Sequence, residues 1–83
     1  MEDKVNGVAE LDGNIYTVCQ GSEAIRSYRY DCEDSVIKLK DIVVRGMKDA
    51  CDLVACLKTK RLYVADQHVI WVVTLTSHTM VST

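Results

Sequence analysis

The 83-residue chain contains no proline, no low-complexity tract and no hydrophobic run near the ~20 residues that a membrane-spanning helix needs. Its first residues are acidic and lack the apolar segment of a secretory signal, so we expect a cytoplasmic protein with no membrane contact. The formal net charge of −2 gives no electrostatic reason to expect nucleic acid or an anionic membrane as a partner of the whole chain.

Motifs for metals, phosphates and nucleophiles are also missing. No C-x-x-C pair occurs, so zinc is not expected, and without a secretory signal we expect reduced thiols rather than disulfides. The four glycines are isolated and form no phosphate-binding loop. His78 lies in a polar tail without a nucleophile turn, so we expect no enzyme activity and no cofactor. The cysteines are Cys19, Cys32, Cys51 and Cys56.

The sequence that is present favours β structure. A hydrophobic content of 48% and a mean hydropathy of +0.01 fit an ordered chain rather than a disordered one. Asp12-Gly13 lies between two β-rich runs and predicts a hairpin, because both turn positions need a positive φ. Further β-rich runs separated by polar turns predict an all-β, antiparallel protein. The expected strands are 8–11, 14–19, 24–30, 36–44, 53–57, 61–65 and 69–75.

A strand pair occurs twice along the chain. Tyr16 and Tyr63 lie 47 residues apart, Val8 and Val54 lie 46 apart, and Ile25 and Ile70 lie 45 apart. Such a period is typical of β-propeller blades, which have roughly 40–50 residues each. The drift from 47 to 45 predicts a hairpin loop that is two residues shorter in the second copy.

The repeat divides the chain into β-propeller-like antiparallel blades, one nearly complete and one truncated. Propellers typically need about 4–8 blades, so the chain is expected either to be a piece of a longer protein or to assemble as several copies. The predicted divisions are an N-terminal extension (1–7), a first blade (8–44), a connector (45–52), a second blade (53–75) and a C-terminal tail (76–83).

The run from Leu62 to Asp66, a short loop and the run from Val69 to Val73 resemble the repeat of NHL-type six-bladed β-propellers. That repeat has a tyrosine-valine-aspartate strand, a turn and an arginine-isoleucine strand. The resemblance covers roughly residues 8–75 and is weaker in the first copy, where Val18-Cys19 replaces the alanine-aspartate pair. It implies propeller blades whose basic rims contact partner proteins or RNA.

The repeat predicts an architecture rather than an activity. We expect a non-catalytic scaffold that presents loops for protein–protein recognition, as a fragment of a larger propeller. One alternative is a ligand- or sugar-binding module formed when copies assemble into a ring. Another is the remnant of a propeller enzyme with a metal site, to which only Asp66 and His68 would contribute. For Asp66 itself we favour a structural role, in which its carboxylate accepts hydrogen bonds from the backbone of its own turn.

The residues expected to contact a partner lie in the two turns of the second copy. A basic set there, accompanied by Arg45 and Lys48, would suit a protein partner or further blades. RNA is disfavoured, although still open, because nearby acidic residues offset the basic charge. The candidate rim residues are Lys58, Lys60, Arg61, Gln67 and His68.

Overall fold

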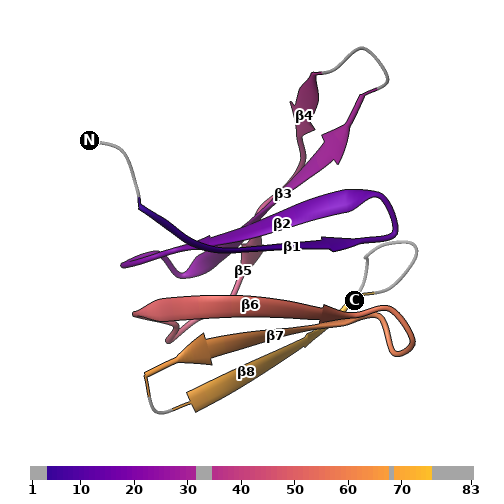
Figure 1. Ribbon diagram of the computed structural model, residues 1–83. Coiled ribbons are helices and arrows are strands. Elements are labelled where there is room, and N and C mark those ends of the chain that lie inside the picture. The colour runs from indigo at the N-terminus through magenta and orange to yellow at the C-terminus, as the bar shows by residue number, and fades with distance from the viewer. Residues whose placement is uncertain (1–3, 32–34, 68, 76–83) are drawn as a thin grey trace.

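The computed structural model describes residues 4–31, 35–67 and 69–75, and these residues form two antiparallel β-sheets (Figure 1). The predicted all-β class is therefore confirmed. The two sheets do not close into a ring. In the described part of the chain, no helix has the length and apolar character required to cross a membrane. The predicted tail at 76–83 lies outside the described residues.

Sheet A contains the first five strands. Its hairpin turn has positive φ at both Asp12 (53°) and Gly13 (84°), as the Asp-Gly pair predicts. The strand order is β1-β2-β3-β4, and β5 also pairs with β3. The strands are β1 (Val5–Leu11), β2 (Asn14–Cys19), β3 (Ala24–Tyr30), β4 (Val36–Lys38) and β5 (Ile42–Val43).

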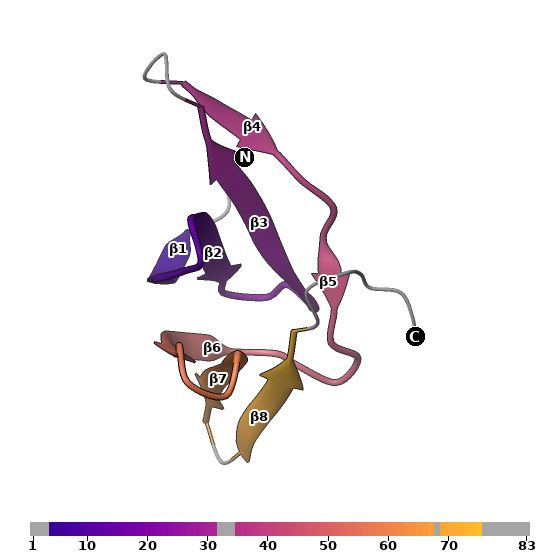
Figure 2. The ribbon, with the colours of Figure 1, turned by 90° about the vertical axis from the view of Figure 1, so that its right-hand side faces the viewer.

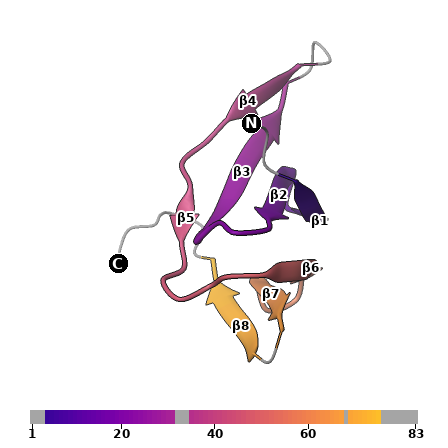
Figure 3. The same ribbon diagram turned by 90° about the vertical axis from the view of Figure 1, so that its left-hand side faces the viewer.

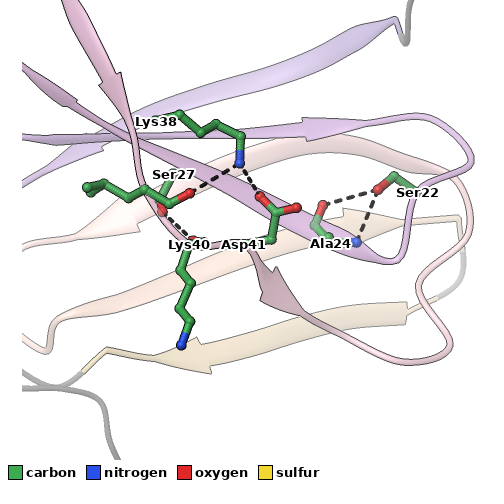
Figure 4. A network of polar contacts seen from close by, with 7 residues as sticks. Ser22, Ala24, Ser27, Lys38, Lys40 and Asp41 are labelled. Carbon is green, nitrogen blue, oxygen red and sulfur yellow. Dashed lines mark hydrogen bonds and ion pairs between the residues drawn. The ribbon is translucent and has the colours of Figure 1, made fainter.

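The outer strand expected at 36–44 is broken into β4 and β5. Tyr28 pairs with Lys38 and Ile25 pairs with Ile42, so three residues of the outer segment oppose two residues of β3. This extra residue is a β-bulge. The Ser27 hydroxyl donates to the Lys40 carbonyl oxygen over 2.7 Å and holds the bulge against β3 (Figure 4).

Sheet B contains β6 (Ala50–Cys56), β7 (Arg61–Asp66) and β8 (Val69–Thr74) in that order. Both inner strands begin three residues before the expected positions, β1 at Val5 and β6 at Ala50. The connector is correspondingly shorter and forms a turn at 45–46.

The two sheets meet along β1 and β6, which run in the same direction (Figure 1). The Asn6 amide donates to the Ala50 carbonyl oxygen over 2.9 Å, and further along the strands Lys60 pairs with Asp12. At Gly7 the backbones are so close that an added Cβ would lie 2.8 Å from the Leu53 nitrogen. Figures 2 and 3 show that the two sheets diverge from this edge, with β4 lying far from sheet B.

The sheets pack front to back. The strands β1 and β6 are parallel, and in each sheet the later strands follow in the same order. The side chains of sheet A that point towards sheet B therefore occupy the repeat positions whose equivalents in sheet B point away from sheet A. Tyr16 is accordingly buried between the sheets, whereas Tyr63 points away from sheet A on the other face of β7. The core between the sheets comprises Leu11, Tyr16, Val18, Ile25, Met47, Ala50, Leu53, Leu62 and Val64.

The loop lengths agree with the spacings of 47 and 45. The β7–β8 turn is two residues shorter than the β2–β3 loop, as predicted, and the β6–β7 loop is two residues longer than the β1–β2 turn. Val8 therefore corresponds to Leu53 by position in the strand, and its expected equivalence to Val54 is wrong by one residue.

Candidate functional site

The most highly connected polar group of sheet B is the Asp66 carboxylate, at the end of β7. Its Oδ1 accepts a hydrogen bond from the Asp49 backbone N–H over 2.9 Å. Its Oδ2 accepts from the Lys48 backbone N–H and from the Trp71 indole Nε1–H, both over 2.9 Å. We call these four residues the Asp66 clamp. They join the connector, β7 and β8 at one point.

The clamp is a structural device rather than a reactive site. Asp66 is only 6% exposed, and the N–H groups of Lys48, Trp71 and Asp49 stabilise its charged form, so they hold the pKa of its carboxyl group below its ordinary value of 3.8. Both oxygens are occupied by protein donors, which leaves Asp66 poorly suited to ligate a metal. In the described residues, no three His, Cys, Asp or Glu side chains are grouped closely enough to hold a metal ion.

The structural role expected of Asp66 is confirmed. Its backbone donors among the described residues lie in the connector before β6, whereas the expectation placed them in its own turn, where His68 lies outside the described residues. The connector approaches Asp66 because it leads into Ala50, the first residue of β6, which pairs with Asp66 across the sheet. The contribution of Trp71 was missed, although an indole five residues after a turn aspartate is a signal that the sequence contains.

The candidate rim residues lie at two opposite ends of sheet B. Lys58, Lys60 and Arg61 lie in or beside the β6–β7 loop, whereas Gln67 lies in the β7–β8 turn. The length of β7 separates these ends by roughly 17 Å, at about 3.3 Å per residue. His68 lies outside the described residues. The expected rim is therefore not one continuous surface.

The basic residues of the connector are also separated from the β6–β7 loop. The Lys48 carbonyl oxygen accepts a hydrogen bond from the Gly21 N–H over 2.8 Å, at the end where the β2–β3 loop lies. Gln67 lies at the same end, where its side-chain amide donates a hydrogen bond to the Asp49 carboxylate over 2.9 Å and so contacts the protein itself. The described rim and connector residues form no single basic stripe for a phosphate backbone.

At the opposite end, two loops from different sheets are tied together. The Lys60 ammonium group lies 2.7 Å from the Asp12 carboxylate and so links the β6–β7 loop to the β1–β2 turn. We call this surface, formed by Asp12, Gly13 and residues 57–61, the hairpin end. Leu57 is 61% exposed there, and Lys58 and Arg61 are exposed beside it.

Three cysteines are free thiols, namely Cys19, Cys51 and Cys56, while Cys32 lies outside the described residues. Hydrogen bonding to the Thr59 hydroxyl is the main reason that the pKa of the Cys56 thiol is lowered from 9.0. Cys19 is buried and behaves as a small hydrophobic residue.

One groove lies on the face of sheet A that points away from sheet B. Its volume is about 600 Å³, and its lining is mainly apolar. The lining residues are Val8, Ala9, Glu10, Gly13, Ile15 and Tyr30.

Comparison of the chain with known protein families, curated proteins and solved structures gave no match to any of them.

Proposed function

We propose that the chain is a non-catalytic segment of a β-propeller, in which each sheet is one blade, and that it recognises a protein partner through the hairpin end. The observation that supports this best is the front-to-back packing of two sheets whose inner strands are parallel. Neighbouring blades of a propeller are related by rotation about an axis along their inner strands, which produces such packing. Two antiparallel hairpins of a sandwich related by a twofold axis would instead bury the same face twice.

The hairpin end has the composition of a recognition surface. Loops on a rigid scaffold are the usual carriers of binding residues, and here the Asp12–Lys60 ion pair holds two such loops side by side. Leu57 supplies exposed apolar area, and Lys58 and Arg61 place positive charge around it. An apolar centre with a charged rim is the common anatomy of protein interfaces, so the partner surface is expected to be apolar with an acidic rim.

The test is photo-crosslinking from the hairpin end in cells, with a photoreactive residue at Lys58. The matched control places the same residue at Gln20, which is exposed at the opposite end of the sheets. We expect one discrete protein product at Lys58 and none at Gln20. With that partner purified, the double variant Lys58→Glu and Arg61→Glu should weaken binding at least tenfold.

Three results would contradict the proposal. They are identical products at both positions, an affinity unaffected by the charge reversal, or a crosslinked product that ribonuclease removes. The last result would instead identify RNA as the partner.

A further inference from the structure

The face of sheet B that points away from sheet A is apolar and open. Val54, Ile70 and Val72 are 55%, 62% and 53% exposed, and half-buried Tyr63 and Ala65 lie between them. The strand register places Val54, Tyr63 and Val72 in one row across the sheet, with Ala65 beside Ile70 in the adjacent row. Contiguous apolar area of this kind is typical of an interaction surface.

The repeat indicates what covers such a face. Tyr63 and Ile70 correspond to Tyr16 and Ile25, which are 6% and 0% exposed because sheet B packs over them. The open face of sheet B thus repeats, one blade later, the residues that sheet A buries against another sheet. Its natural occupant is a sheet that presents the opposite face of the same repeat.

The open face of sheet A belongs to that opposite face. Val8, which is 60% exposed, stands at the position of Leu53, and Ile15 stands at the position of Leu62. In sheet B those two leucines are core residues that pack against sheet A. The groove lined by Val8 and Ile15 lies where residues of an incoming sheet would insert.

We infer that the open face of sheet B binds the open face of sheet A in a second copy of this chain, front to back. The contact inside the chain joins two different surfaces, so each chain leaves one surface of each kind open. A contact between unlike surfaces can repeat until a ring closes. Since propellers typically have about 4–8 blades and each chain supplies two, the ring contains two to four copies.

The contact between copies is looser than the contact within the chain. Asp52 stands where Gly7 does in sheet A, and at Gly7 the backbones of β1 and β6 are so close that an added Cβ would lie 2.8 Å from the Leu53 nitrogen. An aspartate at this position keeps the next inner strand at a greater distance. The assembly is therefore concentration-dependent, and Asp52→Gly should shift its dissociation to at least tenfold lower concentration.

The experiment blocks each face separately and then mixes the variants. Ile70→Lys with Val72→Glu blocks the sheet B face, whereas Val8→Lys blocks the sheet A face. All three positions are exposed, so both variants should fold, which circular dichroism checks. The solution mass of the 83-residue chain, measured by light scattering across a concentration series, is expected to show discrete rings for the unchanged protein and monomers for each variant alone.

Mixing the two variants gives the decisive result. One variant keeps an intact sheet A face and the other keeps an intact sheet B face. We expect a 1:1 complex of the two variants and no larger species. The control Leu57→Lys changes a residue as exposed as Ile70 but at the hairpin end, and it should leave assembly unchanged. A monomeric unchanged protein, a variant that still assembles alone, or a mixture without 1:1 complexes would each overturn the inference.

This inference shares the propeller-like packing with the proposed function but does not depend on the hairpin end as a binding surface. Loss of crosslinking at Lys58 with intact rings would refute only the recognition role. Crosslinking that persists in a strictly monomeric protein would refute only the assembly.

Discussion

Sheet A and sheet B repeat the same strand order, yet each is fixed to its surroundings by a different device. Sheet B is held by the Asp66 clamp, whereas Cys19 occupies the position of Asp66 in sheet A and forms no such network with the residues that the structure describes. Sheet A instead has the bulged outer segment that Ser27 secures. The repeat therefore preserves the order and register of the strands, while opposite faces of the two copies pack between the sheets and the polar connections are specific to each copy.

The largest difference between the two copies is at the edge where they meet. Gly7→Val would place a branched side chain against the Leu53 backbone, where a Cβ alone would lie 2.8 Å from the nitrogen. Backbone atoms cannot move aside as a flexible side chain can. We expect a loss of about 3 kcal/mol in the free energy of unfolding, measured by urea denaturation.

The matched control for Gly7 is Gly21→Asn. Gly21 has a φ of 82° and no atoms within 4 Å of an added Cβ, and asparagine tolerates positive φ better than other residues. Its effect should be small. Equal losses at the two glycines would show that the β1–β6 contact is not the point that joins the sheets.

The Asp66 clamp should produce the next largest effect. Asp66→Ala leaves the N–H groups of Lys48, Asp49 and Trp71 without their acceptor, and such groups are costly to leave unpaired. We expect a fall in melting temperature on the order of 10 °C, with a matching change in tryptophan fluorescence. Cys19→Ala, at the equivalent position of sheet A, should lower it much less. A fall as large for Cys19 as for Asp66 would contradict the assigned asymmetry.

The same carboxylate gives sheet B a pH dependence. Because the pKa of Asp66 is lowered in the folded state, its stabilising contribution is complete above its ordinary value of 3.8 and is lost as pH falls through the folded pKa. Thermal melts from pH 7 to pH 2 should therefore show the unchanged protein and Asp66→Asn converging only below about pH 4. A constant difference across that range would show that Asp66 does not titrate as assigned.

Particular residues show how far the sequence could predict this molecule. Asp12-Gly13 and the β-rich runs separated by polar turns were sufficient to predict strands in both sheets. The Tyr16–Tyr63 spacing predicted the repeat but not that the two tyrosines lie on opposite faces relative to the neighbouring sheet. The early start of β1 was missed because Asn6 and Gly7 have weak strand propensity, and only the contact with β6 explains them.

The candidate site was less predictable than the strands for a physical reason. Two of the donors to Asp66 are backbone groups that lie 17 and 18 residues earlier in the chain, and only the path of the connector brings them to it. Lys58 and Gln67 looked like neighbours in sequence, but β7 runs between them from one end of the sheet to the other. In both cases the path of the chain through the fold, rather than the type of residue, determines which groups lie together.

Thr17 offers a change that should make sheet A more like sheet B and more stable. Its hydroxyl oxygen is buried and has no hydrogen-bond partner among the described residues, whereas Val64 occupies the same position in sheet B. Thr17→Val should raise the free energy of unfolding by about 1 kcal/mol, measured by urea denaturation. Thr17→Ser retains the hydroxyl and should give no gain. A loss of stability for the valine variant would indicate that the hydroxyl has a bound partner in solution.

The smallest expected effect is at the ion pair that links the two sheets at the hairpin end. Asp12 and Lys60 are 53% and 46% exposed in their side chains, so solvent and salt weaken their attraction. A double-mutant cycle with Asp12→Asn and Lys60→Gln should give a coupling of about 0.5 kcal/mol that falls in 1 M salt. A coupling near zero at low salt would mean that the β1–β6 contact alone positions the two loops, and that the hairpin end owes its rigidity to the sheets rather than to the charges.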